Sequence, residues 1–407
     1  MLAFLLTNRR WLGAGFLLTL ASAFGQTWFI SLFAGGIKAE HGLSDGSWGS
    51  LYAVATLASA GLLFLRGSLA DTVPIGRLVP ATTVVFAAAC LGMVFAGSLV
   101  TLGVSLFLLR FCGQGMFSHI AMTAMGRSFR ASRGRATAIA SLGYPAAEML
   151  LPVATVLAIG ALGWRATWGI AAGLLGLIVL PLLVTLLSAR REPQGTGEAT
   201  DAPGLGERHW TRAEAVGHWL FPMLLPTMLT PSFVGTVVFF HQVHIAGVKG
   251  WTLPQMAAGH TAFALVTVFA GLGTGWAADR FGPHRLLAPF ILPMAAGVAL
   301  IAPAEDARLW IVALGLIGVT QGANAALWGA FLPFVYGTRN LGAVRSMVTT
   351  VMVVSTAVGP AVTGVLIDWG MAFPEQALFL GAWCLGLSGI GLLVQRRLGA
   401  EMALRPA

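Results

Sequence analysis

Charged residues are scarce in this sequence. Only 10% of its 407 residues are Asp, Glu, Lys or Arg, whereas a soluble globular chain carries about 25%. Hydrophobic residues make up 57% of the chain, and the mean hydropathy is +0.82. Lysine occurs only at Lys38 and Lys249, so arginine carries most of the net charge of +9. This composition excludes a soluble globular protein and favours one that lies in a membrane.

Cysteine and the usual enzyme signatures are equally sparse. Cys90, Cys112 and Cys384 each lie in an apolar run, and their spacing matches neither a disulfide framework nor a metal site. The sequence contains no G-x-S-x-G, no H-E-x-x-H, no clustered carboxylate pair and no phosphate-binding G-x-x-x-x-G-K-[ST] loop. We therefore expect no enzyme, no cofactor, no metal and no ATP-driven pumping by this chain alone.

Long apolar stretches are what the chain does contain. Each is about 20 residues, long enough to cross about 30 Å of hydrocarbon as a helix. About twelve spans are expected. A break at Ala96-Gly-Ser98 divides the apolar run 78–125, which as one helix would be about twice as long as the bilayer is thick. The expected spans are near 11–37, 48–70, 78–98, 100–125, 134–160, 164–189, 216–246, 252–277, 285–302, 307–334, 345–368 and 374–395.

The arginines predict how these spans are oriented. If the N-terminus is cytoplasmic, nineteen arginines fall on that side, and only Lys38, Arg165, Lys249 and Arg308 fall on the other. This is the positive-inside pattern, so both termini are expected in the cytoplasm, in a bacterial inner membrane. Basic residues gathered in short turns orient helices and do not form a nucleic-acid surface, so no nucleic-acid partner is expected.

One extended polar segment divides the chain. Residues 190–215 are rich in Gly, Pro and acidic residues and have too little apolar content to bury a core. The expected organisation is a six-helix bundle over 1–189, a flexible cytoplasmic linker over 190–215 and a second six-helix bundle over 216–407.

The two halves repeat one motif, G-x-x-x-D, after their second spans. Gly67-Ser-Leu-Ala-Asp71 and Gly275-Trp-Ala-Ala-Asp279 lie 208 residues apart, and a basic turn follows each. Four residues separate Asp71 from Gly76-Arg77 in the first copy, whereas two separate Asp279 from Gly282 in the second. A duplicated chain with one such motif per half indicates a two-lobed transporter.

These features resemble the major facilitator superfamily over the whole chain. Arg110-Phe-Cys-Gly-Gln114-Gly115 in the fourth span and Arg133-Gly-Arg135-Ala136 at the start of the fifth are similar to other signatures of that family. Tyr336-Gly-Thr-Arg339-Asn-Leu-Gly-Ala-Val-Arg345 most resembles the bacterial monocarboxylate and oxalate/formate branch. The resemblance implies an all-α fold of twelve transmembrane helices in two pseudo-symmetric six-helix bundles. The chain departs from that branch because span eight offers only His260, near its outer end, and span eleven has no interior cation.

The repeated motifs are expected to act as a gate. An acidic residue at a helix end faces a basic turn, and an ion pair there can hold one state of a two-state element. The alternative is that these residues only anchor the loop among lipid headgroups. The candidate gating residues are Gly67, Asp71, Arg77, Gly275, Asp279, Arg280 and Arg285.

Arg110 is the most informative single residue, because it lies about ten residues into the fourth span. A cation near mid-bilayer costs about 2.5–3.5 kcal/mol on insertion scales, so it should face the bundle interior. Glu148 lies at a comparable depth in the fifth span, and we expect the two to approach each other. Three readings stay open: a structural role for Arg110 on backbone carbonyls of the first span, proton coupling through Glu148 and Arg110, and direct binding of an anionic substrate.

Other polar and aromatic residues at helical spacing mark expected cavity faces in the first, fourth, seventh and tenth spans. In the seventh, Pro231 follows Thr230 and is expected to break the helix. The alternative for each residue is an interhelical hydrogen bond. The expected substrate-binding residues are Gln26, Phe29, Arg110, Gln114, Thr230, Gln321, Asn324 and Trp328.

The sequence therefore predicts a monomeric secondary transporter that works by alternating access in a lipid membrane. The preferred substrate is a small organic anion such as a monocarboxylate, and its transport is expected to be coupled to protons as symport or antiport. The competing hypothesis is efflux of drugs or other hydrophobic compounds by proton antiport. A receptor or an intramembrane enzyme belongs to a different class and lacks its signature motifs here.

Overall fold

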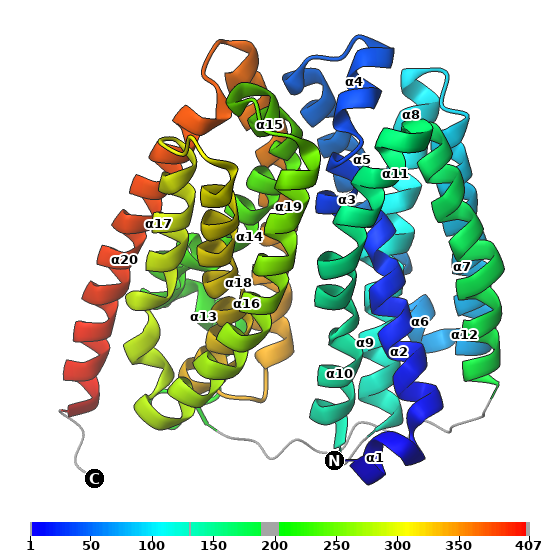
Figure 1. Cartoon of the computed structure of the whole chain (residues 1–407). Helices are drawn as coiled ribbons and strands as arrows, with labels where there is room; N and C mark the ends of the chain where they lie inside the picture. Colours follow the sequence, from blue (N-terminus) through cyan, green and yellow to red (C-terminus); the bar gives the residue numbers. More distant parts are fainter. Residues whose placement is uncertain (1, 130–131, 189–202, 404–407) are drawn as a thin grey trace. The chain divides into compact units, whose positions relative to one another are not determined.

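The computed structural model describes residues 2–129, 132–188 and 203–403, and within these ranges every regular element is a helix. The chain divides into two compact units. Unit 1 comprises Met1–Glu198 and Pro360–Asp368, and unit 2 comprises Ala199–Gly359 and Trp369–Ala407. Figure 1 shows long helices running side by side within each unit, as an all-α membrane protein requires.

Unit 1 begins with short and broken helices and continues with longer ones (Figure 1). In chain order they are α1 (Leu2–Thr7), α2 (Arg9–Ala21), η1 (Ser22–Gly25), α3 (Thr27–Ser31), α4 (Ala34–His41), α5 (Asp45–Arg66), α6 (Leu69–Thr72), α7 (Ile75–Val94), α8 (Leu99–Leu109), η2 (Arg110–Phe117), α9 (Ser118–Ser128), α10 (Arg133–Ser141), α11 (Gly143–Gly173), η4 (Leu174–Val179) and α12 (Leu180–Leu187).

Unit 2 contains several of the longest helices. They are α13 (Arg212–Gly217), α14 (Leu220–Phe240), α15 (Gln242–Lys249), α16 (Leu253–Phe281), η5 (Pro283–Leu286), η6 (Pro289–Ile291), α17 (Leu292–Ile301), α18 (Ala307–Tyr336), α19 (Leu341–Asp368) and α20 (Phe373–Ala403). The last nine residues of α19, 360–368, group with unit 1, where the Asp368 carboxylate accepts bonds from Ser44 Oγ at 2.7 Å and from the Gly46 amide at 3.0 Å.

The twelve expected spans are present as helices. Ten stretches of the described chain are long and apolar enough to cross a membrane. One of them, Gly134–Leu187, is 54 residues long and contains both the fifth and the sixth expected spans. Gly163 separates these two, because its φ of 81° and ψ of 165° lie outside helical geometry and suit glycine. The ninth expected span is the shorter apolar segment Pro289–Ile301.

The break expected at residues 96–98 is confirmed. α7 ends at Val94 and α8 begins at Leu99. Ser98 caps α8, because its side chain accepts a hydrogen bond from the Thr101 amide at 3.2 Å while Thr101 bonds back to the Ser98 amide. Such a capping box satisfies two amides that have no partner within the helix.

A cluster around Arg165 closes one end of unit 1. Arg165 forms an ion pair with Glu40 at 2.5 Å and donates to the carbonyls of Val94 and Ala96 at the end of α7. Its guanidinium also lies 4.4 Å from the Trp164 ring, and Trp164 Nε1 donates to Glu40. The hydrogen bond from Arg165 holds the pKa of Glu40 below its ordinary value of 4.5.

The other cations assigned to the outer side are used in a similar way. Lys38 pairs with Asp45 at 2.7 Å in unit 1. Lys249, in unit 2, donates to the Ala302 carbonyl at 2.5 Å. Arg308 is exposed near the start of α18. Three of the four outer cations therefore hold helix ends or loops in place.

Part of the expected linker is ordered against unit 2. The Leu205 amide donates to the Val335 carbonyl at 2.8 Å, and the Trp210 amide donates to the Tyr336 carbonyl at 3.2 Å. Thr211 and Glu214 then form the capping box of α13. The polar segment expected to be flexible over 190–215 thus has a described part, 203–215, that is bonded to the end of α18, and its residues 190–202 lie outside the described chain.

Candidate functional site

The first span is interrupted in the middle of unit 1. α2 ends at Ala21, a short 3-10 turn covers Ser22–Gly25, and Gln26 is extended at φ −82° and ψ 150° before α3 begins. This break leaves backbone carbonyls without the amide partners that a continuous helix would supply. The sequence gives no proline here, so the cause of the break lies in packing.

That packing is a close approach between two glycines. A Cβ added at Gly25 would lie 2.2 Å from the Leu109 carbonyl oxygen and 2.8 Å from Gly113 Cα. A Cβ added at Gly113 would lie 2.7 Å from Gly25 Cα. Real side chains do not tolerate such distances, so the first and fourth spans meet backbone to backbone at a point that only glycine allows.

Arg110 lies beside this contact and binds the broken span. Its Nη1 donates to the Gly25 carbonyl at 2.9 Å and to Thr27 Oγ1 at 3.3 Å. The guanidinium carbon lies 5.1 Å from the centroid of the Tyr52 ring, within range of a cation–π interaction. Arg110 is only 3% exposed, so the expectation that it faces the interior agrees with its burial. The bond from Arg110 Nη1 to the Gly25 carbonyl is the structural role proposed above, in which Arg110 binds backbone carbonyls of the first span.

Arg110 also begins a π-helical segment, Arg110–Phe117. A π-helix is wider than an α-helix and is often found at functional sites. Arg110 and Phe117 are buried here, whereas Gln114 is exposed, and Phe117 packs edge to face on Phe86 at 5.2 Å. The cavity face expected in the fourth span assumed α-helical spacing, which this segment does not have.

Phe29 and Gln26 occupy different environments within the first span. Phe29 is 1% exposed and lies in an aromatic cluster. The centroid of its ring is 5.4 Å from that of Trp168 and 5.3 Å from that of Phe33. Gln26 is half-buried at the break itself. Phe29 is therefore core in this structure, and Gln26 is the one of the pair that reaches the surface.

Glu148 is half-buried near the start of α11. This helix is fixed against α2, because a Cβ at Gly143 would lie 2.3 Å from the Phe16 carbonyl oxygen. The hydrogen bonds that the structure describes for Arg110 go to Gly25 and Thr27. The approach of Glu148 to Arg110 stays a hypothesis.

In unit 2, α14 runs unbroken through its three prolines, Pro222, Pro226 and Pro231. Pro226 and Pro231 lie inside Leu220–Phe240, so the break expected at Pro231 does not occur. Thr230 Oγ1 donates to the Pro226 carbonyl at 2.8 Å and accepts from Trp383 Nε1 at 3.0 Å. The first of these is the bond that a threonine inside a helix makes to the carbonyl four residues earlier, whereas the carbonyl deprived of an amide partner by Pro231 is that of Thr227.

The tenth-span residues pack against α14 and against one another. A Cβ at Gly235 would lie 2.8 Å from Gln321 Nε2, so the Gln321 side chain crosses α14 at this glycine. Trp328 Nε1 donates to Asn324 Oδ1 at 2.9 Å, one turn along α18. This bond uses the only polar atom of the Trp328 side chain, so the amide nitrogen of Asn324 is the donor that the pair retains.

The second copy of the repeated motif lies at the end of α16, and the first lies at the α5–α6 turn. Gly275 and Asp279 are within α16, and Gly282, at φ 85°, ends it. Asp279, Arg280 and Arg285 are exposed, and among the described residues no ion pair joins them.

In the first copy, the carbonyl of Gly67 lies 3.1 Å from His119 Nε2, and Arg77 is exposed on α7. The side chain of Asp71 lies outside the described residues. The gating role of both copies stays a prediction.

Sequence reasoning missed two members of the Arg110 site. Thr27 and Tyr52 bond to each other at 2.6 Å through their hydroxyls, and Tyr52 is fully buried. The chain has only three tyrosines, so the position of Tyr52 inside a predicted span could have marked it as a candidate site residue. In unit 2, sequence reasoning noted His260 but missed its partner Gln242; both are fully buried, with His260 Nε2 and Gln242 Oε1 2.8 Å apart.

Comparison with known proteins agrees with this architecture. The family model of the Major Facilitator Superfamily matches residues 15–259 and 227–400. A stretch of 129 residues is 33% identical to the multidrug resistance protein B homolog of Mycobacterium tuberculosis (strain CDC 1551 / Oshkosh) and covers 32% of this chain. The same match covers only 23% of that relative, so it compares a fragment of each protein.

Two solved structures share the fold at low sequence identity. A bacterial homolog of the human lysosomal transporter Spinster, inward-facing and unoccupied, aligns over 96% of this chain and 97% of its own, with a TM-score of 0.72 and 16% identity. The nucleoside transporter NupG aligns over 94% and 99%, with a TM-score of 0.67 and 12% identity. The family match over nearly the whole chain and the twelve-helix architecture show that this chain belongs to the major facilitator superfamily and is a membrane transporter.

Proposed function

We propose that this transporter moves a small organic anion of the monocarboxylate type across the bacterial inner membrane by alternating access. The observation that carries the proposal is the buried Arg110, held by Gly25, Thr27 and Tyr52 in the middle of unit 1. An intramembrane cation of this kind is rare because of its energetic cost, and it usually marks a substrate or ion pathway.

Arg110 retains donors for a substrate. A guanidinium has five N–H donors in a planar fork, and the two described hydrogen bonds both come from Nη1. Its Nε is buried without a partner among the described residues. A carboxylate accepts two parallel bonds from such a fork, and the hydroxyls of Thr27 and Tyr52 lie close to the same group.

Proton coupling is proposed to depend on Glu148, with Arg110 favouring its ionised form. Glu148 is a half-buried carboxylate within a membrane span, and such residues commonly relay protons in transporters. The proposed substrate-binding set is completed by polar and aromatic residues of the first, fourth, seventh and tenth spans, Gln26, Phe29, Gln114, Thr230, Gln321, Asn324 and Trp328.

Efflux of drugs or other hydrophobic compounds by proton antiport is the second candidate. The 129-residue similarity to a multidrug resistance protein homolog favours it. In that case Glu148 would still exchange protons, and Arg110 would serve only to hold the first span. Both candidates place the two termini in the cytoplasm and treat the protein as a monomer.

Counterflow in proteoliposomes tests the substrate class. We expect a labelled short-chain monocarboxylate to accumulate in liposomes preloaded with the unlabelled acid. Arg110→Lys should raise the KM about tenfold, because an ammonium cannot reproduce a bidentate contact worth about 1.4 kcal/mol. Arg308→Lys, at an exposed site, is the matched control and should transport as the wild type does. Export of lipophilic dyes without flux of any acid would overturn the anion proposal.

A second variant tests the coupling. Glu148→Gln should abolish uptake driven by a pH gradient and retain exchange of substrate at equal pH, because the amide cannot carry a proton between the two sides. Glu375→Gln, at an exposed position in the first turn of α20, is the control. Unchanged gradient-driven uptake in Glu148→Gln would remove Glu148 from the coupling mechanism.

A further inference from the structure

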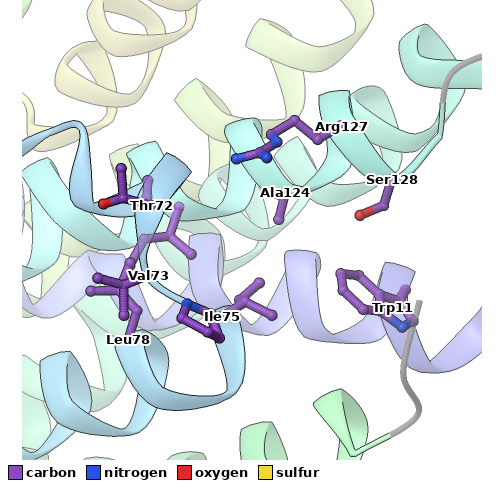
Figure 2. Close-up of a pocket in the computed structure, with 11 residues that line it drawn as sticks. Trp11, Thr72, Val73, Ile75, Leu78, Ala124, Arg127 and Ser128 are labelled. Atoms are coloured by element: carbon purple, nitrogen blue, oxygen red, sulfur yellow. The ribbon is translucent and has the colours of Figure 1, made fainter. Parts of the chain in front are cut away.

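A cavity of about 340 Å³ opens at the end of unit 1 where α2 and α7 begin and α9 ends (Figure 2). Trp11 comes from α2, Val73 and Pro74 from the turn after α6, Leu78 from α7 and Arg127 from α9. All of its lining residues belong to unit 1. None of them is in the Arg110 site.

The turn that forms one wall is longer in this half of the chain. The first copy of the repeated motif has Thr72-Val-Pro-Ile75 between Asp71 and Gly76, whereas the second copy has only Arg280-Phe281 before Gly282. All four residues of the longer turn line the cavity. The cavity is therefore built from the segment in which the two copies of the motif differ.

The lining is amphipathic. Trp11, Ile75, Leu78 and Ile120 supply an apolar wall, and Thr72, Arg127 and Ser128 supply polar groups. Figure 2 shows Arg127, Ala124 and Ser128 on one helix, with the apolar side chains of the turn and of Trp11 across from them.

Two exposed arginines lie at neighbouring helix ends of unit 1, and the acidic residue Asp71 stands between the lining residues Ala70 and Thr72 in the chain. Arg66 ends α5 and Arg77 lies in the first turn of α7, and both are exposed. This end of unit 1 is the one that the arginine distribution assigns to the cytoplasm, where headgroups of anionic lipids concentrate. A tryptophan beside aliphatic side chains is typical of the headgroup level of a membrane.

We propose that this cavity binds a phospholipid with an anionic headgroup, taken from the cytoplasmic leaflet. Its phosphate lies against Arg127, and the first methylenes of an acyl chain lie against Trp11 and Leu78. A free phosphate ion would leave the apolar wall exposed to water, so the lining favours an amphiphile. Because the lipid contacts the turn that follows Asp71, it stabilises the first copy of the motif.

Lipid binding to purified protein tests the site. The probe is dioleoyl phosphatidylglycerol, added to the full chain in detergent and counted by native mass spectrometry, with dioleoyl phosphatidylcholine and inorganic phosphate as comparison ligands. We expect one phosphatidylglycerol retained per chain in preference to phosphatidylcholine, and no competition by phosphate. Arg127→Gln should weaken binding about fivefold, which corresponds to the ~1 kcal/mol that one arginine contributes near an anionic lipid.

Two further variants keep the test decisive. Ala124→Leu adds bulk to the cavity wall without changing charge and should also weaken binding at least fivefold; it carries the test if Arg127→Gln does not fold. Arg212→Gln removes an exposed arginine at the start of α13 in unit 2 and should bind as the wild type does. Equal retention of the two lipids, displacement by phosphate, or unchanged binding in Arg127→Gln and Ala124→Leu would each overturn the proposal.

Discussion

The contact between Gly25 and Gly113 gives the sharpest quantitative prediction. In Gly25→Ala the new Cβ would lie 2.2 Å from the Leu109 carbonyl oxygen and 2.8 Å from Gly113 Cα. Both are backbone atoms and cannot rotate away, so the first span must move by more than 1 Å to reach an ordinary van der Waals distance of roughly 3.5 Å.

The energetic effect has two parts. Forcing an extra carbon into a packed contact costs about 1–3 kcal/mol. Moving Gly25 also breaks the bond from Arg110 to its carbonyl, and a hydrogen bond from a charged donor is worth about 1.5–3 kcal/mol. We therefore expect Gly25→Ala to lower the free energy of unfolding by about 3–6 kcal/mol and to abolish transport, since Arg110 loses its orientation.

Unfolding in mixed detergent micelles by increasing fractions of dodecyl sulfate measures this effect. Gly126→Ala is the matched control, because it lies in α9 with nothing within 4 Å of its added Cβ. Alanine is the better helix former by about 1 kcal/mol, so this control should be neutral or slightly more stable. Gly25→Ala with wild-type stability and transport would refute the backbone contact and the position of Arg110 that depends on it.

Two further predictions concern hydrogen bonds in unit 1. Because Arg165 lowers the pKa of Glu40 in the folded state, the stability contributed by their pair is present above pH 4.5 and is lost as the pH falls through the lowered pKa. The melting temperatures of the wild type and of Glu40→Gln should therefore differ at pH 7 and converge below pH 4.5. A difference in melting temperature that stays the same at every pH would contradict this. Tyr52→Phe removes the 2.6 Å hydrogen bond to Thr27 and keeps the ring beside Arg110. We therefore expect the free energy of unfolding to fall by about 1 kcal/mol and the KM for substrate to rise. An unchanged KM would show that this hydroxyl does not orient the site.

The number and places of the spans could be predicted because hydropathy and helix capping are local properties. The separation of α7 from α8 follows from Ser98, which has both the residue type and the position of a helix cap. The repeated motif likewise gave the family, since its spacing recurs within the sequence itself.

The interior of the site could not be predicted in the same way, because distant contacts determine it. The break at Gln26 depends on Gly25 meeting Gly113 in another span, and the π-helical segment after Arg110 carries no local signal. Helical spacing alone therefore did not show that Phe29 packs in an aromatic cluster, and its place in the substrate-binding set stays a prediction. The break expected at Pro231 does not occur, because a proline inside a membrane helix is tolerated without ending it, and α14 continues through this residue.

The way in which the outer cations are used has a kinetic consequence. Lys38 and Arg165 face carboxylates, and Arg308 follows the exposed acidic residues Glu305 and Asp306. Lys249 keeps its charge because it binds a neutral carbonyl, so most of the charge carried by the four cations has acidic residues close by. Long-range attraction of a charged solute requires uncompensated charge at the entrance, and ionic strength weakens it. A solute arriving from outside should thus encounter this protein at a rate that added salt hardly changes.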